Sequence, residues 1–508
     1  MDLARRGVRT LLLERSTTPR RLPKMERCNA RTMEIFRRLG LEAAIRKASL
    51  FTPMPMDIFI MASFSRPPLL HLSYPSVPEA KQLIAQCGDG TLPLEPAQLI
   101  SQYTLEPILR DAAAQAGVDV RYGAEVSAFT QDDEGVSVSI NGAAETVRGR
   151  YLVGCDGGVS TVRKQLGIEL QGRGRIKLIH QVFFRSEQLF AKIPTGRGRH
   201  YYFAEGAIVV QDDLRHFMVN FQDWQPGQDA VTRLRQMIDL DIDIEVLSEA
   251  DWRHHLLVAE RYRGGRALIA GDAAHLVIPQ GGLGMNTGIG DAIDLAWKLA
   301  GTVHGWAGPA LLDSYDAERR EIGLRNRDAS GAAAQGVGRW RAAVRPCIRD
   351  DSAEGEANRR EVSALAAEGQ PMSHEMHGIE LGYRYSKSPV IAAEESPVES
   401  TTCNYLPNAT PGVRLPHVWR EDGSPVHEGL GNDYTLLALE PDGDTASIEA
   451  AMKRIGAPMQ LARMPEAHLR RIYEKRLLLI RPDLHVAWRG DRLPDDADAL
   501  ARLVTGRG

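Results

Sequence analysis

The stretch RALIAGDAAHLVIPQGGLGMNTGIGDAIDLAWKLA, residues 266–300, decides the fold of this chain. Its apolar start, residues 267–270, predicts a buried strand that ends at Gly271 and Asp272. Residues 279–286 contain too much glycine for regular structure. From about Gly290, apolar residues recur every three or four positions, which predicts a helix. A strand, an acidic turn, a glycine loop and a helix in this order form a cradle for a cofactor.

The residue types of this cradle suit a flat ring that carries hydroxyl groups and phosphates. The Asp272 carboxylate can accept hydrogen bonds from ribose-type hydroxyls. Glycines let the backbone approach a ring closely, and a helix N-terminus presents free N–H groups to negative charge. The alternative is an ordinary strand–loop–helix connection, but a connection does not need the five glycines that follow Pro279. These are Gly281, Gly282, Gly284, Gly288 and Gly290.

Composition excludes several classes of protein. The 508 residues suffice for about two to four domains, and 43% hydrophobic with 25% charged residues is typical of a globular protein. A net charge of −4 without a basic run gives no basis for nucleic-acid binding. Five scattered cysteines without a CxxC motif argue against a disulfide framework or zinc site and favour the cytoplasm. We find no metal motif, signal peptide or membrane-spanning run, and expect no membrane association.

A second acidic corner lies far from the first in sequence. Residues 151–163, YLVGCDGGVSTVR, run from an apolar strand into Asp156 and Gly157, and a helix beginning at Ser160 carries Arg163. Such a corner alone is common. Two of them, in this order and far apart in the chain, form a specific pattern.

The two corners together resemble motifs of the single-component flavoprotein aromatic hydroxylases, the para-hydroxybenzoate hydroxylase-like family. The match to the family's "GD" motif covers Gly271, Asp272, Ala273, His275, Pro279, Gly281, Gly284, Asn286 and Asp291, and the earlier corner resembles its "DG" motif. The resemblance implies that Asp272 holds the ribityl chain of FAD and that the glycine loop lies against the flavin pyrimidine. It implies that Asp156 and Arg163 serve FAD and the nicotinamide coenzyme. The implied FAD contacts of the central stretch are Gly271, Asp272, Gly281, Gly282, Leu283, Gly284, Met285 and Asn286.

The start of the chain reads as the second half of a dinucleotide-binding unit. Residues 8–13 predict a strand that ends at Glu14 and Arg15, and Glu14 lies where an acidic residue would bond the adenosine ribose. The first strand and its GxGxxG loop do not occur in the sequence as given. We favour a start codon assigned downstream of the true one over a truncated product. The chain as given is then expected to bind FAD weakly, and an upstream-extended chain to bind it; equal flavin content in both would contradict this.

Three further side chains are candidate FAD contacts. Arg27 and Arg31 precede or open a predicted helix, and the segment from Arg31 to Glu34 resembles the family. The resemblance places one cation from this segment near the FAD phosphates or ribose, whereas the alternative is a solvated basic face. Gln102 matches a family position that reaches the ribityl–phosphate region, although a polar residue on a surface helix explains it almost as well.

The predicted substrate region is a mostly antiparallel sheet. Strand-like segments alternate through residues 176–258 and suit the roof of a pocket. Tyr201, Phe203 and Asn220 are candidates to face an aromatic substrate, although sheet core is favoured for any single one. Pro279 is the candidate for lining the catalytic site beside the flavin.

The predicted fold class is α/β (α+β). It comprises a Rossmann-like FAD/NAD(P)-binding domain lacking its first strand (residues 1–50, 97–170 and 259–390), a β-sheet substrate domain (51–96 and 171–258), a linker (391–411) and a C-terminal domain (412–508). The strand–helix–strand–strand–helix order of the last resembles the thioredoxin-like domain of the phenol hydroxylase branch. Without a CxxC motif, its expected role is packing or subunit contact in a homodimer.

The resemblance implies a monooxygenase that hydroxylates a phenolic or other aromatic compound with molecular oxygen. NADPH or NADH reduces FAD, and a flavin C4a-hydroperoxide transfers the oxygen. Epoxidation, Baeyer–Villiger insertion or plain oxidation on the same fold are alternatives, and so is an inactive protein unable to hold FAD. No metal is required.

Overall fold

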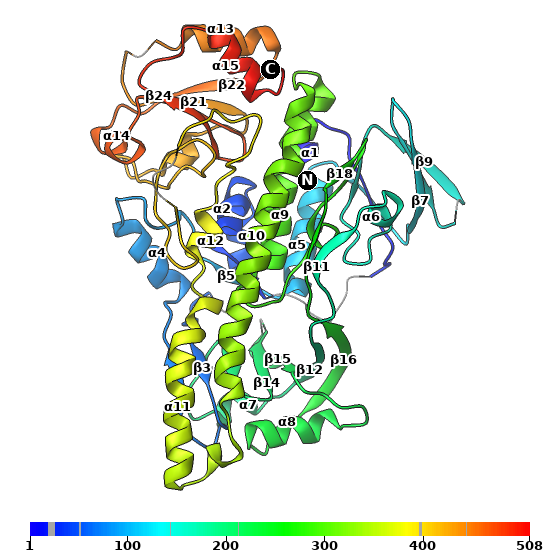
Figure 1. Cartoon of the computed structure of the whole chain (residues 1–508), viewed down its shortest axis with the longest axis vertical. Coiled ribbons are helices and arrows are strands. Elements are labelled where there is room, and N and C mark those ends of the chain that lie inside the picture. The colour runs from blue at the N-terminus through cyan, green and yellow to red at the C-terminus, as the bar shows by residue number, and fades with distance from the viewer. Residues whose placement is uncertain (19–25, 50–51, 143, 212, 396–398, 443) are drawn as a thin grey trace.

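The computed structural model describes residues 1–508 except 19–25, 50–51, 143, 212, 396–398 and 443. The molecule is a mixed α/β structure in which two long helices, α9 (Leu283–His304) and α10 (Pro309–Ala342), pass through the middle (Figure 1). A four-stranded sheet with helices lies at one end of these helices. A seven-stranded sheet lies at the other end.

Two small sheets beside the central stretch each contain a parallel pair of strands. Strand β1 (Leu11–Glu14) pairs in parallel with β6 (Asp119–Tyr122). Strand β10 (Leu152–Gly154) pairs in parallel with β19 (Ala267–Ile269), and β18 (Arg263–Gly264) adds to it. Strand β19 is completely buried beneath α9 and α10. The sequence correctly predicts β1, β6, β10 and β19 and the buried character of β19, whereas β6 is largely exposed and β18 was not predicted.

The start of α9 differs from the prediction. The helix begins at Leu283 rather than near Gly290, because the two glycines at positive φ, Gly281 (88°) and Gly282 (63°), complete the turn. The Asn286 side chain then donates to the Gly282 carbonyl at 2.6 Å. Gly288 lies inside the helix, where a Cβ would be 3.1 Å from the Gly271 Cα. This glycine therefore serves the close approach of helix and turn rather than a loop.

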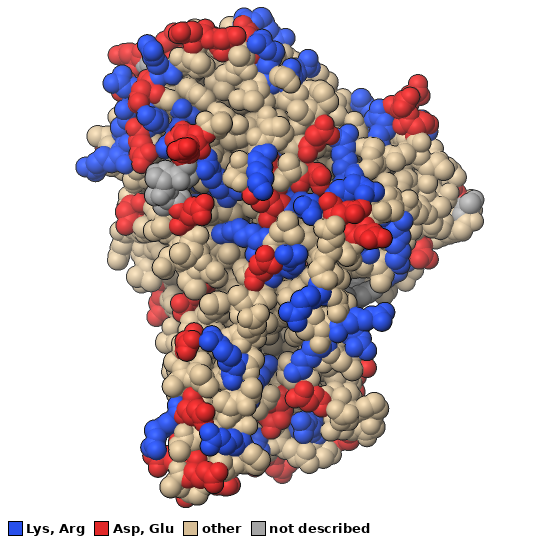
Figure 2. Space-filling view, in the orientation of Figure 1, with Lys and Arg blue, Asp and Glu red and all other residues tan. Residues whose placement is uncertain are grey.

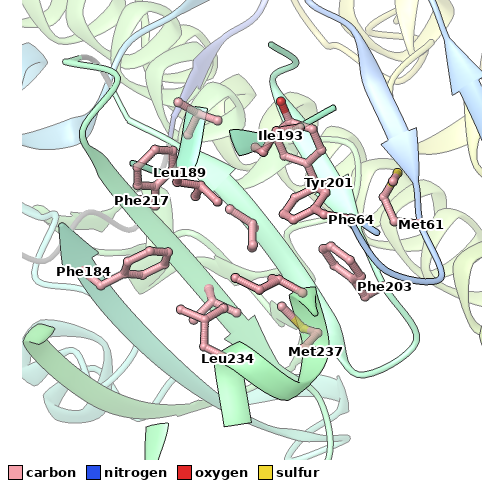
Figure 3. Close-up of a cluster of buried hydrophobic side chains, with 14 of the residues drawn as sticks. Met61, Phe64, Phe184, Leu189, Ile193, Tyr201, Phe203, Phe217, Leu234 and Met237 are labelled. Atoms are coloured by element: carbon pink, nitrogen blue, oxygen red, sulfur yellow. The ribbon is translucent and has the colours of Figure 1, made fainter. Parts of the chain in front are cut away.

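The seven-stranded sheet has the order β16-β12-β15-β14-β13-β3-β4 and is antiparallel except for the β13–β3 pair. This confirms the mostly antiparallel sheet expected from the sequence. Its strands are β16 (Glu245–Arg253), β12 (Leu178–Arg185), β15 (His216–Phe221), β14 (Gly206–Val210), β13 (His200–Tyr202), β3 (Ile58–Ile60) and β4 (Leu70–Leu72). Helices α7 (Leu189–Lys192) and α8 (Ala230–Ile238) cover one face with an apolar core (Figure 3).

Helix α10 extends from the parallel strands to the seven-stranded sheet, and α11 (Ala353–Gly369) packs back against it (Figure 1). Helices α11 and α12 (His377–Leu381) have no counterpart among the elements expected from the sequence. The apolar face of α11 is narrow: Val362 and Ala366 pack on Val337 and Trp340 of α10. Tertiary packing therefore stabilises α11, although its charged sequence does not predict a helix.

The C-terminal sheet has the order β22-β21-β23-β24. The predicted strand–helix–strand–strand–helix order is present as β21 (Tyr434–Ala438), α13 (Ala446–Ile455), β23 (Leu477–Ile480), β24 (Val486–Gly490) and α15 (Ala497–Val504). The structure adds β22 (Met459–Arg463) and α14 (Ala467–Tyr473), which the sequence pattern did not reveal. Strand β22 is half exposed and is interrupted by Gln460 and Arg463, so it lacks an apolar run.

The remaining elements surround these sheets. The helices are α1 (Asp2–Arg5), α2 (Ala30–Arg38), α3 (Glu42–Ala48), α4 (Val77–Gln86), α5 (Gln102–Gln115) and α6 (Thr161–Gln165). The strands are β2 (Arg27–Cys28), β5 (Gln98–Leu99), β7 (Val126–Gln131), β8 (Val136–Ile140), β9 (Glu145–Gly149), β11 (Leu170–Arg173), β17 (Leu256–Ala259) and β20 (His275–Leu276). Acidic and basic side chains are interspersed on the face drawn in Figure 2. Within the described ranges, no helix combines the length and apolarity needed to cross a bilayer.

Candidate cofactor site

The two acidic corners lie at the same edge of one small sheet. Strands β10 and β19 are adjacent and parallel, so both corners follow the carboxyl ends of their strands. The Ala270 N–H donates to the Gly154 carbonyl at 3.1 Å. Arg163 joins the corners directly, because its guanidinium donates to the carbonyls of Ala273 and Gly158, each at 2.9 Å. Two segments more than a hundred residues apart thus form one structural unit.

The two carboxylates at this edge have different surroundings. Asp156 accepts from the Ser160 hydroxyl at 2.5 Å and from the Val162 N–H at 3.1 Å, so it stabilises the start of α6. Asp272 is exposed, and no group of the described residues hydrogen-bonds its carboxylate. An exposed acceptor at the end of a buried parallel strand is available to a ligand.

A buried carboxylate, Asp291 on α9, holds the turn that carries Asp272. One oxygen of Asp291 accepts from the Gly271 N–H at 3.0 Å and lies 2.8 Å from His275 Nε2. The other accepts from Arg319 Nε at 2.8 Å. Burial opposes the charge on Asp291, but Arg319 and His275 lower its pKa. The sequence matched Asp291 to the motif without showing this role, because Arg319 comes from a different helix.

The glycine loop lies between this turn and the start of α9. The Gly282 N–H donates to the Pro279 carbonyl at 2.8 Å, and the Pro279 ring is exposed. A Cβ at Gly281 would overlap Met376 Sδ, so only glycine fits there. At the loop's end Leu283 is buried, Gly284 and Met285 are half-buried, and the Asn286 amide binds the backbone of Arg27 and Asn29.

The two candidate cations near the start of the chain, Arg27 and Arg31, contact different parts of the protein. Arg27 forms an ion pair with Glu380 at 2.8 Å, and its Nη1 lies 3.3 Å from the Gly281 carbonyl. Arg31 instead donates to the Asp483 carbonyl of the C-terminal domain at 2.7 Å. Of the two, only Arg27 contacts the glycine loop.

The other predicted contacts lie at the ends of β1 and α5. Glu14 accepts from the Ser16 N–H at 2.7 Å, and Arg15 is exposed. The Gln102 side chain donates to Glu106 within α5.

Strand alternation corrects two of the predicted substrate contacts. Tyr201 and Phe203 are completely buried in the core beneath α7 and α8, where both pack on Phe64 (Figure 3). The Tyr201 hydroxyl donates to the Gly196 carbonyl within that side. Along β15, Asn220 alternates with the core residues Val219 and Phe221 and so lies on the other face. Its Oδ1 is buried, and none of the described residues hydrogen-bonds it.

The same outer face of β13 carries a titratable cluster that the sequence did not reveal. The Glu26 carboxylate accepts from Arg199 Nη2 at 2.8 Å, and His200 Nε2 lies 3.1 Å from the same oxygen. The Tyr202 hydroxyl lies 3.2 Å from His200 Nδ1. The ring of His374 is 5.9 Å from those of His200 and Tyr202. The outer face could have been inferred from β15, where the apolar residues Phe217, Val219 and Phe221 mark the side that faces the core.

Burial and neighbouring charges fix the protonation of this cluster. Burial opposes ionisation of Glu26, but hydrogen bonds and charges from His200 and Arg199 lower its pKa. Burial, followed by the charge of Arg199, lowers the pKa of His200. Burial raises the pKa of Tyr202 to about 12. At neutral pH Glu26 is therefore a carboxylate, His200 a neutral imidazole and Tyr202 a phenol.

A cavity of about 550 Å³ lies between the ends of the sheet strands and α10. Ile278 and Gln280, the neighbours of Pro279, line it, and the buried Gln280 Oε1 has no hydrogen-bond partner in the part of the chain that the structure describes. Arg341 lines the opposite wall and places its guanidinium 5.9 Å from the Tyr202 ring centre. The volume is typical of small-molecule sites.

Residues 1–330 match the protein family described as FAD binding domain, and residues 408–506 match the aromatic-ring hydroxylase C-terminal domain. The chain belongs to the FAD-dependent aromatic-ring hydroxylases. Its relatives include the FAD-dependent monooxygenase apdD of Emericella nidulans, 32% identical over 99% of this chain and 87% of that protein. Another is the 4-methyl-5-nitrocatechol 5-monooxygenase of a Burkholderia species, 31% identical over 98% and 92% of the two chains.

Solved structures agree with this assignment. The rebeccamycin biosynthetic enzyme RebC with reduced flavin superposes with a TM-score of 0.90 at 28% identity, covering 100% of this chain and 96% of that one. Aklavinone-11 hydroxylase, in a complex with FAD and aklavinone, gives a TM-score of 0.82 at 28% identity over the same shares. The mixed α/β fold expected from the sequence is therefore confirmed.

The residues present fit FAD. The exposed Asp272 carboxylate suits a polyol, the first turn of α9 presents backbone N–H groups, and a Cβ at Gly282 would have only the Arg27 side chain within 4 Å, so the backbone there is open to a flat ring. These features occupy one continuous edge of the protein.

Proposed function

We propose that this flavin monooxygenase hydroxylates a phenolic or other aromatic compound with molecular oxygen, and takes its electrons from NADPH or NADH. The observation that supports this most directly is that Arg163 bonds both acidic corners, so that they form one unit with the exposed Asp272 at its edge. The names of relatives support an aromatic substrate: one is a nitrocatechol monooxygenase, and one solved structure holds aklavinone.

We propose that FAD is held at this edge by Asp272, Gly271, the glycine loop and the first turn of α9. The proposed contacts are Glu14, Arg15, Arg27, Gln102, Asp156, Arg163, Gly271, Asp272, Gly281, Gly282, Leu283, Gly284, Met285 and Asn286. Arg31 is dropped from this set, because its side chain bonds the C-terminal domain. Asp156 and Asn286 act mainly by shaping the backbone, since their polar atoms are engaged by protein groups.

Bound FAD supplies the reduction and oxygen-transfer chemistry, and the protein supplies position and exclusion of water. We propose that the aromatic substrate lies in the cavity beside Ile278 and Gln280, with Pro279 toward the flavin and Asn220 on the sheet face. The buried Gln280 Oε1 lines this cavity without a hydrogen-bond partner among the described residues, so it is available to a polar substituent on the ring.

We propose that the side chains of Tyr202, His200 and Glu26 together ionise a phenolic substrate. The Tyr202 oxygen accepts the substrate proton while its own proton passes to His200 Nδ1. His200 then carries both ring protons, and the Glu26 carboxylate, 3.1 Å from its Nε2, stabilises that charge. Since the pKa of Tyr202 is about 12, this tyrosine relays a proton rather than holding a charge at neutral pH.

The test is flavin binding followed by oxygen labelling. Purified protein is titrated with FAD, and the loaded protein is given NADPH or NADH, aromatic candidates and ¹⁸O₂. One labelled oxygen as a new ring hydroxyl supports the proposal. Label in an epoxide or an inserted ester oxygen supports the alternative flavin oxygenations, and a protein that never binds FAD supports the inactive alternative.

The remaining assignments are also proposals. We propose the domain division given above, a thioredoxin-like C-terminal domain with a packing role, a homodimer and a cytoplasmic location. The parallel β21–β22 pair beside antiparallel β23 and β24 supports the C-terminal assignment.

A further inference from the structure

The turn that carries Asp272 is connected through buried side chains to the C-terminal domain. Asp291, which holds the Gly271 N–H, is bonded by Arg319. Arg319 also donates to the Thr287 carbonyl and to the Tyr385 hydroxyl, each at 3.1 Å. Asp291 and Arg319 are both at most 1% exposed, so water does not compete for these bonds.

Tyr385 leads into a second buried group. Its ring lies 4.4 Å from the ring of His485 and 5.1 Å from the Arg481 guanidinium. Arg481, on the C-terminal sheet, donates to Asp294 of α9 at 2.8 Å and to Glu318 of α10 at 2.7 and 2.9 Å. Glu318 immediately precedes Arg319, so Arg481 bonds the same turn of α10 that holds Asp291.

The charged side chains of this buried group depend on their oppositely charged neighbours. Arg481 and Lys298 face Asp294, Glu318 and Asp483, and every one of these side chains is at most 3% exposed. Burial raises the pKa of Asp294 to about 8, whereas Arg481 and Lys298 overcome burial and lower the pKa of Glu318 to about 2. Both cations bond Asp294 of α9 and Glu318 of α10. Removing one cation leaves an uncompensated buried charge, which is strongly destabilising locally.

We infer that Arg481 and Tyr385 are positioning residues for the flavin site, so that the C-terminal domain sets the Gly271–Asp272 turn through Arg319 and Asp291. This inference rests on the proposed FAD site. Contacts that merely dock the domain also exist: Arg38 of α2 donates to the Gly431 carbonyl at 2.7 Å and to the Pro482 carbonyl at 3.5 Å, and among the described residues it bonds no side chain of this buried group. That contrast makes the inference testable.

The experiment measures amide hydrogen exchange of the Gly271 segment in protein without FAD, and FAD affinity by titration. Arg481→Met removes the charge, and Tyr385→Phe removes only the hydroxyl that Arg319 donates to. We expect Arg481→Met to speed exchange at Gly271 and to weaken FAD binding by about tenfold, with a smaller change in the same direction for Tyr385→Phe. Arg481→Lys should restore part of both.

Arg38→Met is the matched control at the same interface. It should lower the melting temperature without changing Gly271 exchange or FAD affinity. The inference is overturned if Arg38→Met speeds Gly271 exchange as much as Arg481→Met does, or if folded Tyr385→Phe protein exchanges like the parent. Since exchange is read without FAD, absence of FAD binding in the parent would reject the proposed function while leaving this result interpretable.

Discussion

At the scale of single residues, the site depends on which polar groups the protein leaves available. Asp156 and Asp272 occupy corresponding corners, yet protein donors occupy only Asp156. The sequence predicted both corners correctly because each follows an apolar strand. It did not distinguish their surroundings, because hydrogen bonds such as that from Val162 depend on local backbone geometry.

Asp272→Ala should weaken FAD binding by about ten- to a hundredfold, since hydrogen bonds to a charged acceptor contribute about 1.5–3 kcal/mol. The exposed side chain makes no bond to any residue that the structure describes, so the melting temperature should stay unchanged. Flavin fluorescence titration and thermal unfolding give both quantities. Asp328→Ala, at an exposed position outside the site, is the control. Unchanged affinity in Asp272→Ala would reject its assigned role.

Tyr202→Phe should reduce turnover of a phenolic substrate at neutral pH by about a hundredfold, as expected for loss of a general base. The loss should shrink as pH rises toward the pKa of the substrate phenol, which then ionises without help. The matched control is Tyr201→Phe, whose hydroxyl bonds Gly196 on the opposite face. It should cost stability of about 1 kcal/mol and leave the pH profile of turnover unaltered. A parallel loss in both variants would contradict the relay.

At the scale of elements, α9 shows that similar glycines have different functions. A Cβ at Gly288 would press on the Gly271 backbone, whereas one at Gly284 would meet only Val277 at an ordinary 3.6 Å. Gly284→Ala should therefore stabilise the protein by about 0.5–1 kcal/mol through helix propensity. Gly288→Ala should destabilise it and weaken FAD binding.

Urea unfolding and FAD titration of the two glycine variants separate their roles. We expect Gly284→Ala to bind FAD less tightly despite its greater stability, because the proposed flavin lies against this loop. Undiminished FAD binding by Gly284→Ala would mean that the ring lies elsewhere.

Elements with a strong local pattern were predictable, and those that depend on partners were not. Strand β19 is an apolar run, and β21 is completely buried, so their sequences identify them. Helix α11 and strand β22 lack such runs. The side of β13 was mispredicted at Tyr201 and Phe203 because His200 to Phe203 contains no clear alternation of polar and apolar residues. Which residues of β13 face the core is determined only by its pairing with β14 and β3.

At the scale of the whole molecule, buried histidines dominate the dependence of stability on pH. Burial lowers the pKa of His417 to about 3 and those of His254 and His485 to about 4, and it also lowers those of His374 and His427. Between about pH 4 and 6.5 the unfolded chain then binds more protons than the native protein. Asp294, Asp316 and Asp433, whose pKa values burial raises, act in the opposite direction but are fewer.

The free energy of unfolding should therefore fall as the pH is lowered from 6.5 toward 4, by up to about 1.4 kcal/mol per pH unit for each net proton. Urea unfolding at several pH values measures this slope. His417→Gln should reduce the slope, and His304→Gln, at an exposed position, should not. A stability that rises on acidification would contradict the assignment of neutral buried histidines.

The 34 residues of α10 have one further consequence. This rod carries Arg319, which acts at the cofactor turn, and Arg341, which lines the cavity six turns later. A single inserted residue between them would rotate the distal part by about 100° and carry Arg341 off its wall. Divergence of this protein toward other ring compounds must therefore proceed by exchanging side chains along the rod, since changes in its length would misalign the two ends.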